Sequence, residues 1–172
     1  MEAANYSSSG TLRNGERVLI RSFKPEDREE FFIAAGGLTA ESLRRRFFGS
    51  KTDFSEAEQS FFLNPDFRTH VALIAVVDEA ARPVIAGGVR YVVIEPRQAE
   101  IALAVADKYQ GQGIGGALMR NLTTVARKAG LRELTAHVLP ENIPMLRLLK
   151  NGGLRYKTNF EAGTVHVALE LA

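Results

Sequence analysis

The sequence of 172 residues contains no cysteine. This absence excludes disulfide bonds, thiolate zinc sites and a cysteine nucleophile. It also agrees with a reducing compartment, so we expect a cytoplasmic location.

Long apolar runs and a charge excess of one sign are missing as well. No stretch of about 18 apolar residues is available to span a membrane. The formal net charge is only +2, from 22 basic and 20 acidic residues, so neither a nucleic acid nor a membrane is the expected partner. Residues 1–10 lack the basic start and apolar core of a signal peptide, and we expect them to form a flexible tail.

Apolar residues are plentiful, at 45% of the chain, which is enough to form the core of one domain. No repeat, low-complexity tract or interdomain linker interrupts the sequence. We therefore expect residues 11–172 to form a single domain.

The first third of the chain predicts one strand followed by helices. Residues 18–23 are apolar and β-prone. Helix start signals follow: a proline with an acidic first turn, and later a capping box. Three helices are predicted, from Pro25 to the pair Gly36 and Gly37, after Thr39, and from Ser55 through Phe61.

From residue 70 onward, strands become more frequent. Branched residues on either side of a turn-like segment predict a β-hairpin over 71–77 and 84–94. The remaining patterns predict strands at 98–105, 134–139 and 164–171, and helices from Gly113 and over 142–150. The expected fold class is therefore α/β, with a mixed, mostly antiparallel sheet covered by helices on both faces.

A glycine-rich turn lies between strand 98–105 and the helix from Gly113, which carries a buried stripe. Glycines let backbone N–H groups approach an anion closely, and the first amides of a helix lack internal partners. Four glycines in six residues weaken a helix start by about 1 kcal/mol each, a cost that a bound phosphate would offset. The predicted phosphate-binding residues are Gln110, Gly111, Gln112, Gly113, Ile114, Gly115 and Gly116.

Two other phosphate motifs fit less well. Gly111, Gly113 and Gly116 have the spacing of the dinucleotide fingerprint. However, four residues separate the strand from Gly111, too little chain follows for further βα units, and no acidic residue closes the next strand. A Walker loop is excluded because no Gly-Lys-Ser or Gly-Lys-Thr follows.

The segment LAVADKYQGQGIGGALM resembles the signature of the GNAT superfamily of N-acetyltransferases, in which Gln110, Gly113 and Gly115 match the core pattern. Asn142 matches the asparagine that opens the next helix. The resemblance implies a GNAT fold and acetyl-CoA as cosubstrate. No metal is expected, because the three histidines are far apart in the sequence and no pair has the spacing that places two ligands on one helix face. The resemblance also implies that the strand residues Leu103, Ala104 and Val105 pair with the pantetheine arm, and that an amide near Val105 stabilises the oxyanion.

A narrower resemblance links LTAESLRRRFF at 38–48 and AEIALAV at 99–105 to bacterial protein-lysine acetyltransferases of the Pat type. It implies that Glu100 is the general base, which an amine acceptor with a pKa near 10.4 requires. His137 is the rival base. Glu100, Ala102 and Ala104 alternate with apolar residues and are expected to share one face of their strand.

The resemblance fails at one position, because Leu149 stands where many members carry a tyrosine that protonates the leaving thiolate. The expected acceptor is a primary amine, either a protein lysine or a small amine. A CoA-sensing domain without turnover is the alternative from another class. A serine hydrolase is excluded, since no serine follows Ser60 and no nucleophile-elbow motif is present.

Overall fold

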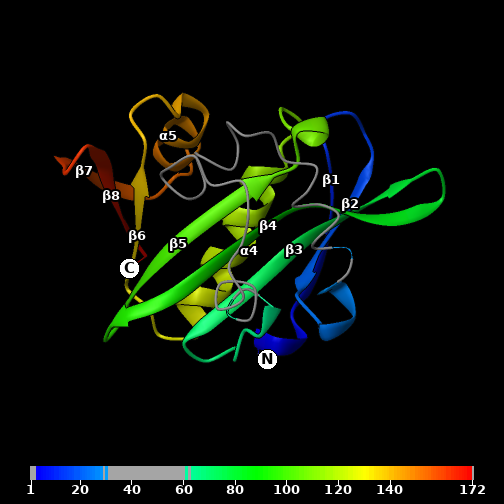
Figure 1. Ribbon diagram of the computed structural model, residues 1–172, viewed down its shortest axis with the longest axis horizontal. Coiled ribbons are helices and arrows are strands. Elements are labelled where there is room, and N and C mark those ends of the chain that lie inside the picture. The colour runs from blue at the N-terminus through cyan, green and yellow to red at the C-terminus, as the bar shows by residue number, and fades with distance from the viewer. Residues whose placement is uncertain (1–2, 29, 31–60, 62, 172) are drawn as a thin grey trace.

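The computed structural model describes residues 3–28, 30, 61 and 63–171. This part contains one eight-stranded sheet with the order β1-β2-β3-β4-β5-β6-β8-β7 (Figure 1). Along the chain the elements are η1 (Ala3–Asn5), β1 (Ser7–Thr11), β2 (Arg17–Ser22), η2 (Pro25–Asp27), β3 (His70–Glu79), β4 (Arg82–Glu95), β5 (Gln98–Val105), η3 (Asp107–Tyr109), α4 (Ile114–Lys128), β6 (Glu133–Val138), α5 (Ile143–Lys150), β7 (Arg155–Glu161) and β8 (Thr164–Glu170).

Antiparallel pairing dominates this sheet. Strands β1 to β5 form a meander in which each strand pairs antiparallel with the next. The exception is β5 with β6, which pair in parallel because α4 carries the chain back across the sheet. Strands β8 and β7 then follow β6 in antiparallel order. The predicted mixed, mostly antiparallel sheet is confirmed.

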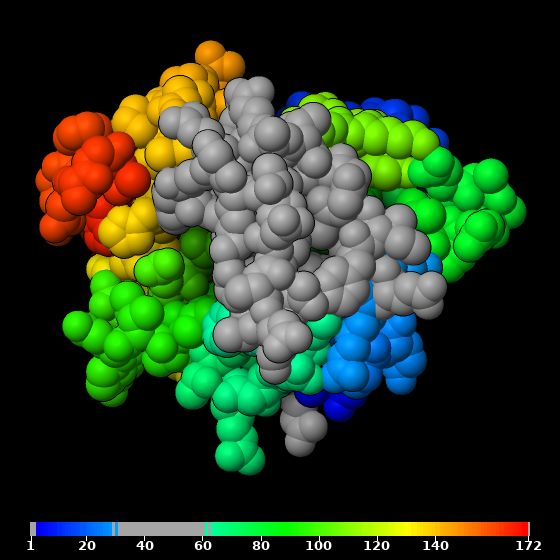
Figure 2. Space-filling model, viewed as in Figure 1, coloured from blue at the N-terminus to red at the C-terminus, as the bar shows by residue number. Residues whose placement is uncertain are grey.

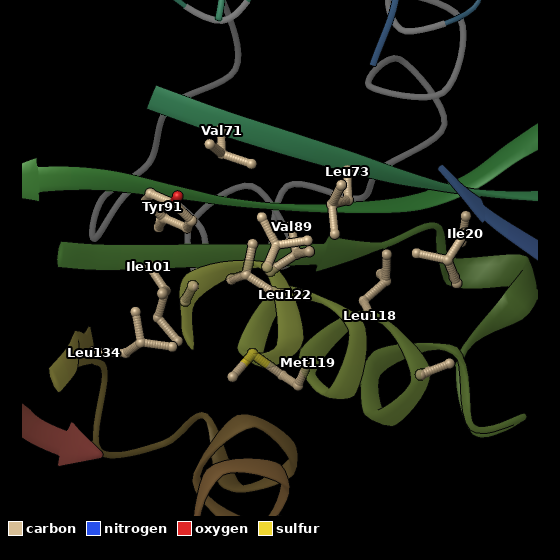
Figure 3. Packing of buried hydrophobic residues seen from close by; sticks show 14 of the residues in the cluster. Ile20, Val71, Leu73, Val89, Tyr91, Ile101, Leu118, Met119, Leu122 and Leu134 are labelled. Carbon is tan, nitrogen blue, oxygen red and sulfur yellow. The ribbon is translucent and has the colours of Figure 1, made fainter. Parts of the chain in front are cut away.

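Helix α4 packs along one face of the sheet and forms the centre of the core. Leu118 and Leu122 are fully buried, as their recurrence on one helical stripe predicts. Figure 3 shows both side chains directed at the strands, toward Leu73 and Val89. The glycine-rich turn at the start of α4 is thereby fixed to the sheet by the helix that follows it.

The N-terminal residues differ from the expected flexible tail. Residues 3–11 form η1 and β1, and β1 pairs with β2 from Ser7 to Thr11. Tyr6 is buried, its amide donates to Ser22 Oγ at 3.0 Å, and its hydroxyl donates to Asn121 on α4. The segment Ser-Ser-Ser-Gly-Thr has no alternating apolar residues. It is held in place by backbone pairing with β2 and by the buried side chain of Tyr6. Neither interaction produces a periodic pattern that the sequence could reveal.

Other expected elements need a boundary correction or lie outside the described residues. The helix expected from Pro25 begins as the short η2, and the helices expected over residues 31–60 fall in the part that the structure does not describe. Strand β7 has no counterpart among the predicted elements. Within the described ranges, no helix is both long and apolar enough to cross a membrane.

Candidate active site

Strands β5 and β6 diverge, and this opening is the central feature of the site. Only Gln98, Ala99 and Glu100 of β5 pair with β6, although β5 continues to Val105. Figure 1 shows the two strands starting side by side and then separating. Within the described residues, β5 remains paired with β4 up to Val105, whereas no strand pairs with its β6-facing edge beyond Glu100.

The backbone of β5 turns two amides into this opening. The amide of Ala106 donates to Ala86 O on the β4 side at 2.8 Å. Because successive N–H groups alternate between the two edges of a strand, the amides of Leu103 and Val105 point to the opposite edge. Two main-chain donors therefore line the gap where β6 has moved away.

The glycine-rich turn joins the end of β5 to α4 through left-handed backbone. Gly111 and Gly113 have φ values of 79° and 96°, which glycine adopts without the strain that a side chain would introduce. The first α-helical hydrogen bond runs from Ala117 N to Gly113 O at 3.1 Å. The amides of Ile114 and Gly115 precede it and have no carbonyl four residues earlier in the helix to bind. These amides lie at the N-terminus of the helix beside the opening, a position at which proteins commonly bind anions.

Gly115 packs closely against the neighbouring helix α5. A Cβ at this position would lie 3.2 Å from Leu148 Cδ2 of α5, closer than ordinary van der Waals contact. Gln110 fixes the other end of the turn, because its Nε2 donates to Val105 O and to Asp107 Oδ1, each at 3.0 Å. The turn is thus tied both to β5 and to α5.

One cleft brings the predicted cofactor residues together. It runs from the end of β5 along the start of α4 to α5. The predicted residues that line it are Leu103, Ala104, Val105, Gln110, Gly111, Gln112, Gly113, Ile114, Gly115, Gly116 and Asn142. Their role in binding a coenzyme stays a prediction, but they border a single continuous space.

Four arginines outside the predicted site residues line the same cleft, and two of them, Arg13 and Arg120, lie beside the glycine turn. Arg13 lies on the turn between β1 and β2, and a Cβ on Gly113 would be 3.7 Å from its Nε. Arg120 follows on α4, with one guanidinium nitrogen 3.2 Å from the Cβ position of Gly116. Both guanidinium groups therefore border the glycine turn and add positive charge beside it.

The β1–β2 turn is hydrogen-bonded to the glycine turn. Arg13 N donates to Gln112 O at 3.2 Å, and Asn14 Nδ2 donates to Gln112 Oε1 at 3.4 Å. About a hundred residues separate these partners in the chain, so no local motif could have revealed the contact.

Asn142 is buried and caps α5. Its side chain accepts a hydrogen bond from Met145 N at 3.3 Å, the usual role of asparagine at a helix start. Leu149, which stands at the position of the family tyrosine, is 2% exposed. This part of α5 therefore contributes packing and a cap.

Glu100 and His137 lie on the face of the sheet opposite α4. Their neighbours Ile101 and Ala136 belong to the core that packs on α4, and side chains alternate along a strand. Glu100 is exposed and is the last β5 residue paired with β6. Within the described part of the chain its carboxylate makes no hydrogen bond or ion pair. It does not line the cleft that holds the other predicted residues.

The rival base is engaged with another ring. His137 pairs across the sheet with His166 of β8, and their ring centroids are 4.8 Å apart. Of the two candidate bases, Glu100 has no such ring contact among the described residues and lies at the point where β5 and β6 separate.

Tyrosine hydroxyls that line the cleft already have acceptors. Tyr6 donates to Asn121 and Tyr109 donates to Glu79. Burial, with a further contribution from the hydrogen bond to Glu79, raises the pKa of Tyr109 to about 12. Its phenol therefore keeps its proton at neutral pH, directed at a carboxylate.

Membership of a family follows from the sequence profile described as the Acetyltransferase (GNAT) family, which matches residues 38–153. The chain belongs to this family and is an acyltransferase of the GNAT type. The fold described above is the one expected from the resemblance.

Two acetyltransferases are similar to this chain in sequence. The chain is 34% identical over 125 residues to "Acetyltransferase PA5475" of Pseudomonas aeruginosa, covering 72% of this chain and 67% of that protein. It is 31% identical over 144 residues to "Acetyltransferase Pat" of Mycolicibacterium smegmatis, covering 83% of this chain but only 42% of that protein. The chain therefore spans less than half of the second relative.

A solved structure agrees over almost the whole length. The GNAT domain of S. lividans PAT superposes with a TM-score of 0.86 at 28% identity, covering 95% of this chain and 96% of that one. The arrangement of strands and helices is therefore shared with a Pat-type GNAT domain.

Proposed function

We propose that this chain transfers the acetyl group of acetyl-CoA directly to a primary amine, with the lysine side chain of a protein as acceptor. The observation that carries the proposal is the parting of β5 and β6 after Glu100. Beyond this point the amides of Leu103 and Val105 do not pair with β6, and they lie in the same cleft as the N-terminus of α4.

In the proposed complex the diphosphate of the coenzyme lies against the amides at the start of α4, where the helix dipole favours an anion. The pantetheine arm then takes the place of β6 along the free edge of β5. Leu103 N–H and Val105 N–H point into this edge, so one of them can donate to the thioester oxygen. Such a donor contributes about 3–4 kcal/mol to the stability of an oxyanion in other acyl-transfer enzymes.

The acceptor amine approaches from the face opposite α4, on which Glu100 is exposed. Glu100 takes a proton from the ammonium group, directly or through water, and the neutral nitrogen attacks the thioester carbon. The C–N bond forms, the C–S bond breaks, the attacking nitrogen releases its second proton to solvent, and CoA leaves as a thiolate. Since the thiol pKa is near 8.5, the thiolate can leave and take its proton from solvent, which suits a site with Leu149 in place of tyrosine.

The choice of a protein lysine rests on the resemblance of residues 99–105 to protein-lysine acetyltransferases and on the exposed position of Glu100. An exposed base can meet the end of a long side chain that is carried on another protein. A small amine needs no such access and is the competing acceptor.

Thiol release tests the proposal. The purified chain should liberate free CoA from acetyl-CoA in the presence of lysine-containing proteins, and mass spectrometry should locate acetyl groups on lysine side chains. Turnover with small amines alone would contradict the acceptor assignment. Binding of acetyl-CoA without turnover of any amine would contradict the catalytic proposal and favour a CoA-sensing role.

A further inference from the structure

Strand β7 forms one end of the sheet and is exposed along its full length. All seven residues from Arg155 to Glu161 are exposed although the strand is paired with β8. Large apolar side chains are included, with Tyr156 45% and Phe160 68% exposed. Figure 2 shows the red β7–β8 hairpin at the margin of the molecule. In the described part of the chain no strand pairs with the outer edge of β7.

Backbone direction identifies the groups on this outer edge. Leu171 N donates to Arg132 O on the β6 side at 2.8 Å. By alternation, the even-numbered residues of β8, including Thr164, present their N–H and C=O groups to β7. Thr164 is opposite Glu161, so the odd-numbered residues of β7 face β8. The even-numbered residues Tyr156, Thr158 and Phe160 therefore direct their N–H and C=O groups outward.

The sequence of β7 is complementary to itself when two copies run antiparallel. With Thr158 opposite the partner's Thr158, the three outward-facing residues of each strand all fall in hydrogen-bonded positions. Tyr156 then lies opposite the partner's Phe160 on one face of the sheet. On the other face Arg155 lies opposite the partner's Glu161 in a non-hydrogen-bonded pair, where side chains are closest.

Neighbouring registers lose this match. Shifting by one hydrogen-bonded position in one direction places Lys157 opposite the partner's Lys157, a repulsive pair. The opposite shift places Lys157 opposite the partner's Glu161 but leaves Arg155 outside the ladder, and both shifts shorten the ladder. The longest ladder and the Arg155–Glu161 pair together favour the register centred on Thr158.

We propose that two copies of this chain pair through β7 in antiparallel orientation, about a two-fold axis at Thr158. The interface is isologous, as in most homodimers. It joins the two eight-stranded sheets into one continuous sheet and covers an edge that would otherwise be open to uncontrolled pairing. This assembly goes beyond the proposed function and does not depend on it.

Charge reversal provides the test, measured by sedimentation equilibrium on the purified chain. The wild type should sediment as a dimer. Arg155→Glu alone and Glu161→Arg alone should each raise the dimer dissociation constant about tenfold or more, because each places two like-charged pairs in the interface. The double variant Arg155→Glu/Glu161→Arg should dimerise like the wild type.

Mixing the two single variants sharpens the test. The Arg155→Glu chain is acidic at both positions and the Glu161→Arg chain is basic at both, so each variant repels a copy of itself. Opposite charges face each other when the two variants pair, and an equimolar mixture should therefore form heterodimers. A monomeric wild type, or single variants that dimerise as well as the wild type, would overturn the proposal.

A backbone variant separates assembly from folding. Thr158→Pro removes an outward-facing N–H that does not bond to β8, and proline is tolerated at such edge positions. This variant should be folded by circular dichroism and monomeric by sedimentation equilibrium. The control Thr158→Ala keeps the N–H and should remain dimeric. A dimeric Thr158→Pro variant with native circular dichroism would also overturn the proposal.

Discussion

Glu100 stands at the last paired position of β5, where the protein surface meets the opening between two strands. Glu100→Gln keeps the shape of the side chain and removes its basicity. We expect turnover to fall about 10²- to 10⁴-fold, the usual contribution of a general base, with little change in the dissociation constant of acetyl-CoA. Thiol release and calorimetry measure the two quantities.

The matched control is Glu95→Gln, an exposed glutamate at the end of β4. It should retain wild-type turnover. If Glu100→Gln also keeps wild-type turnover, the assignment of the base is wrong, and His137 becomes the residue to test.

Gly113 caps α4 with a φ of 96°, which makes its conformation expensive for any other residue. Gly113→Ala should lower the free energy of unfolding by about 1–2 kcal/mol. It should also weaken coenzyme binding, because relief of the strain rotates the peptide groups that point at the phosphate.

Gly130→Ala is the control for backbone strain alone. Gly130 has a φ of 85°, has nothing within 4 Å of an added Cβ and does not line the cleft. It should lose similar stability in urea unfolding and bind the coenzyme normally. Equal effects of both variants on binding would show that the turn does not hold the phosphate.

Asp27 is paired with Arg21 through two hydrogen bonds of 2.8 and 2.7 Å, and Lys24 N donates to the same carboxylate at 2.7 Å. Burial alone would raise the pKa of Asp27, but the hydrogen bonds from Arg21 and Lys24 outweigh it, so the pKa is lowered in the folded protein. Folding therefore favours the ionised carboxylate. Its contribution is complete above the unfolded pKa near 4 and is lost as the pH falls through the folded pKa.

Asp27→Asn should lower the free energy of unfolding by about 1–2 kcal/mol at neutral pH. Urea unfolding at successively lower pH should show the gap to the wild type closing below about pH 4. The exposed residue Asp78 provides the control, since Asp78→Asn should change stability little at any pH. A gap that stays constant with pH would contradict the role of ionised Asp27.

At the scale of elements, the β1–β2 turn brings Arg13 to the glycine turn. Arg13→Gln should raise the dissociation constant of CoA about tenfold, equivalent to about 1.4 kcal/mol, and should reduce its dependence on salt because one exposed cation is lost.

Arg17→Gln is the control on the same hairpin, since Arg17 lies at the start of β2 and outside the cleft. Its affinity for CoA should equal that of the wild type in calorimetric titrations. Equal losses in both variants would mean that only the general charge of the hairpin matters.

Elements with strong local patterns could be predicted from the sequence. The stripe of α4 and the glycine turn before it are visible in a few consecutive residues, and the alternation in β5 correctly divides its two faces. β1 and β7 escaped prediction because neither buries an alternating face: one is polar, and the other is exposed throughout.

The features that could not be predicted from the sequence depend on contacts between distant segments of the chain. Arg13 and Gln112 meet only because β1 and β2 pair at the far end of the meander, and a single sequence carries no local trace of that contact. Glu100 was selected through a resemblance. The structure adds that it lies on the opposite face from α4 and outside the cleft of the predicted coenzyme residues.

At the scale of the whole molecule, the sheet separates the two proposed substrates. The glycine turn is continuous with α4 on one face, while Glu100 and His137 lie on the other. The gap between β5 and β6 connects the two faces of the sheet. A thioester lying in this gap would therefore be accessible to an amine that approaches from the face opposite α4.

The most direct test of this arrangement is a titration of the ¹⁵N-labelled protein with CoA, followed by amide NMR shifts. We expect the largest changes at Leu103, Val105 and the amides from Gly111 to Gly116, with β1 and β2 responding only at their connecting turn. Saturable binding that leaves the amides of β5 and the glycine turn unchanged would contradict this arrangement.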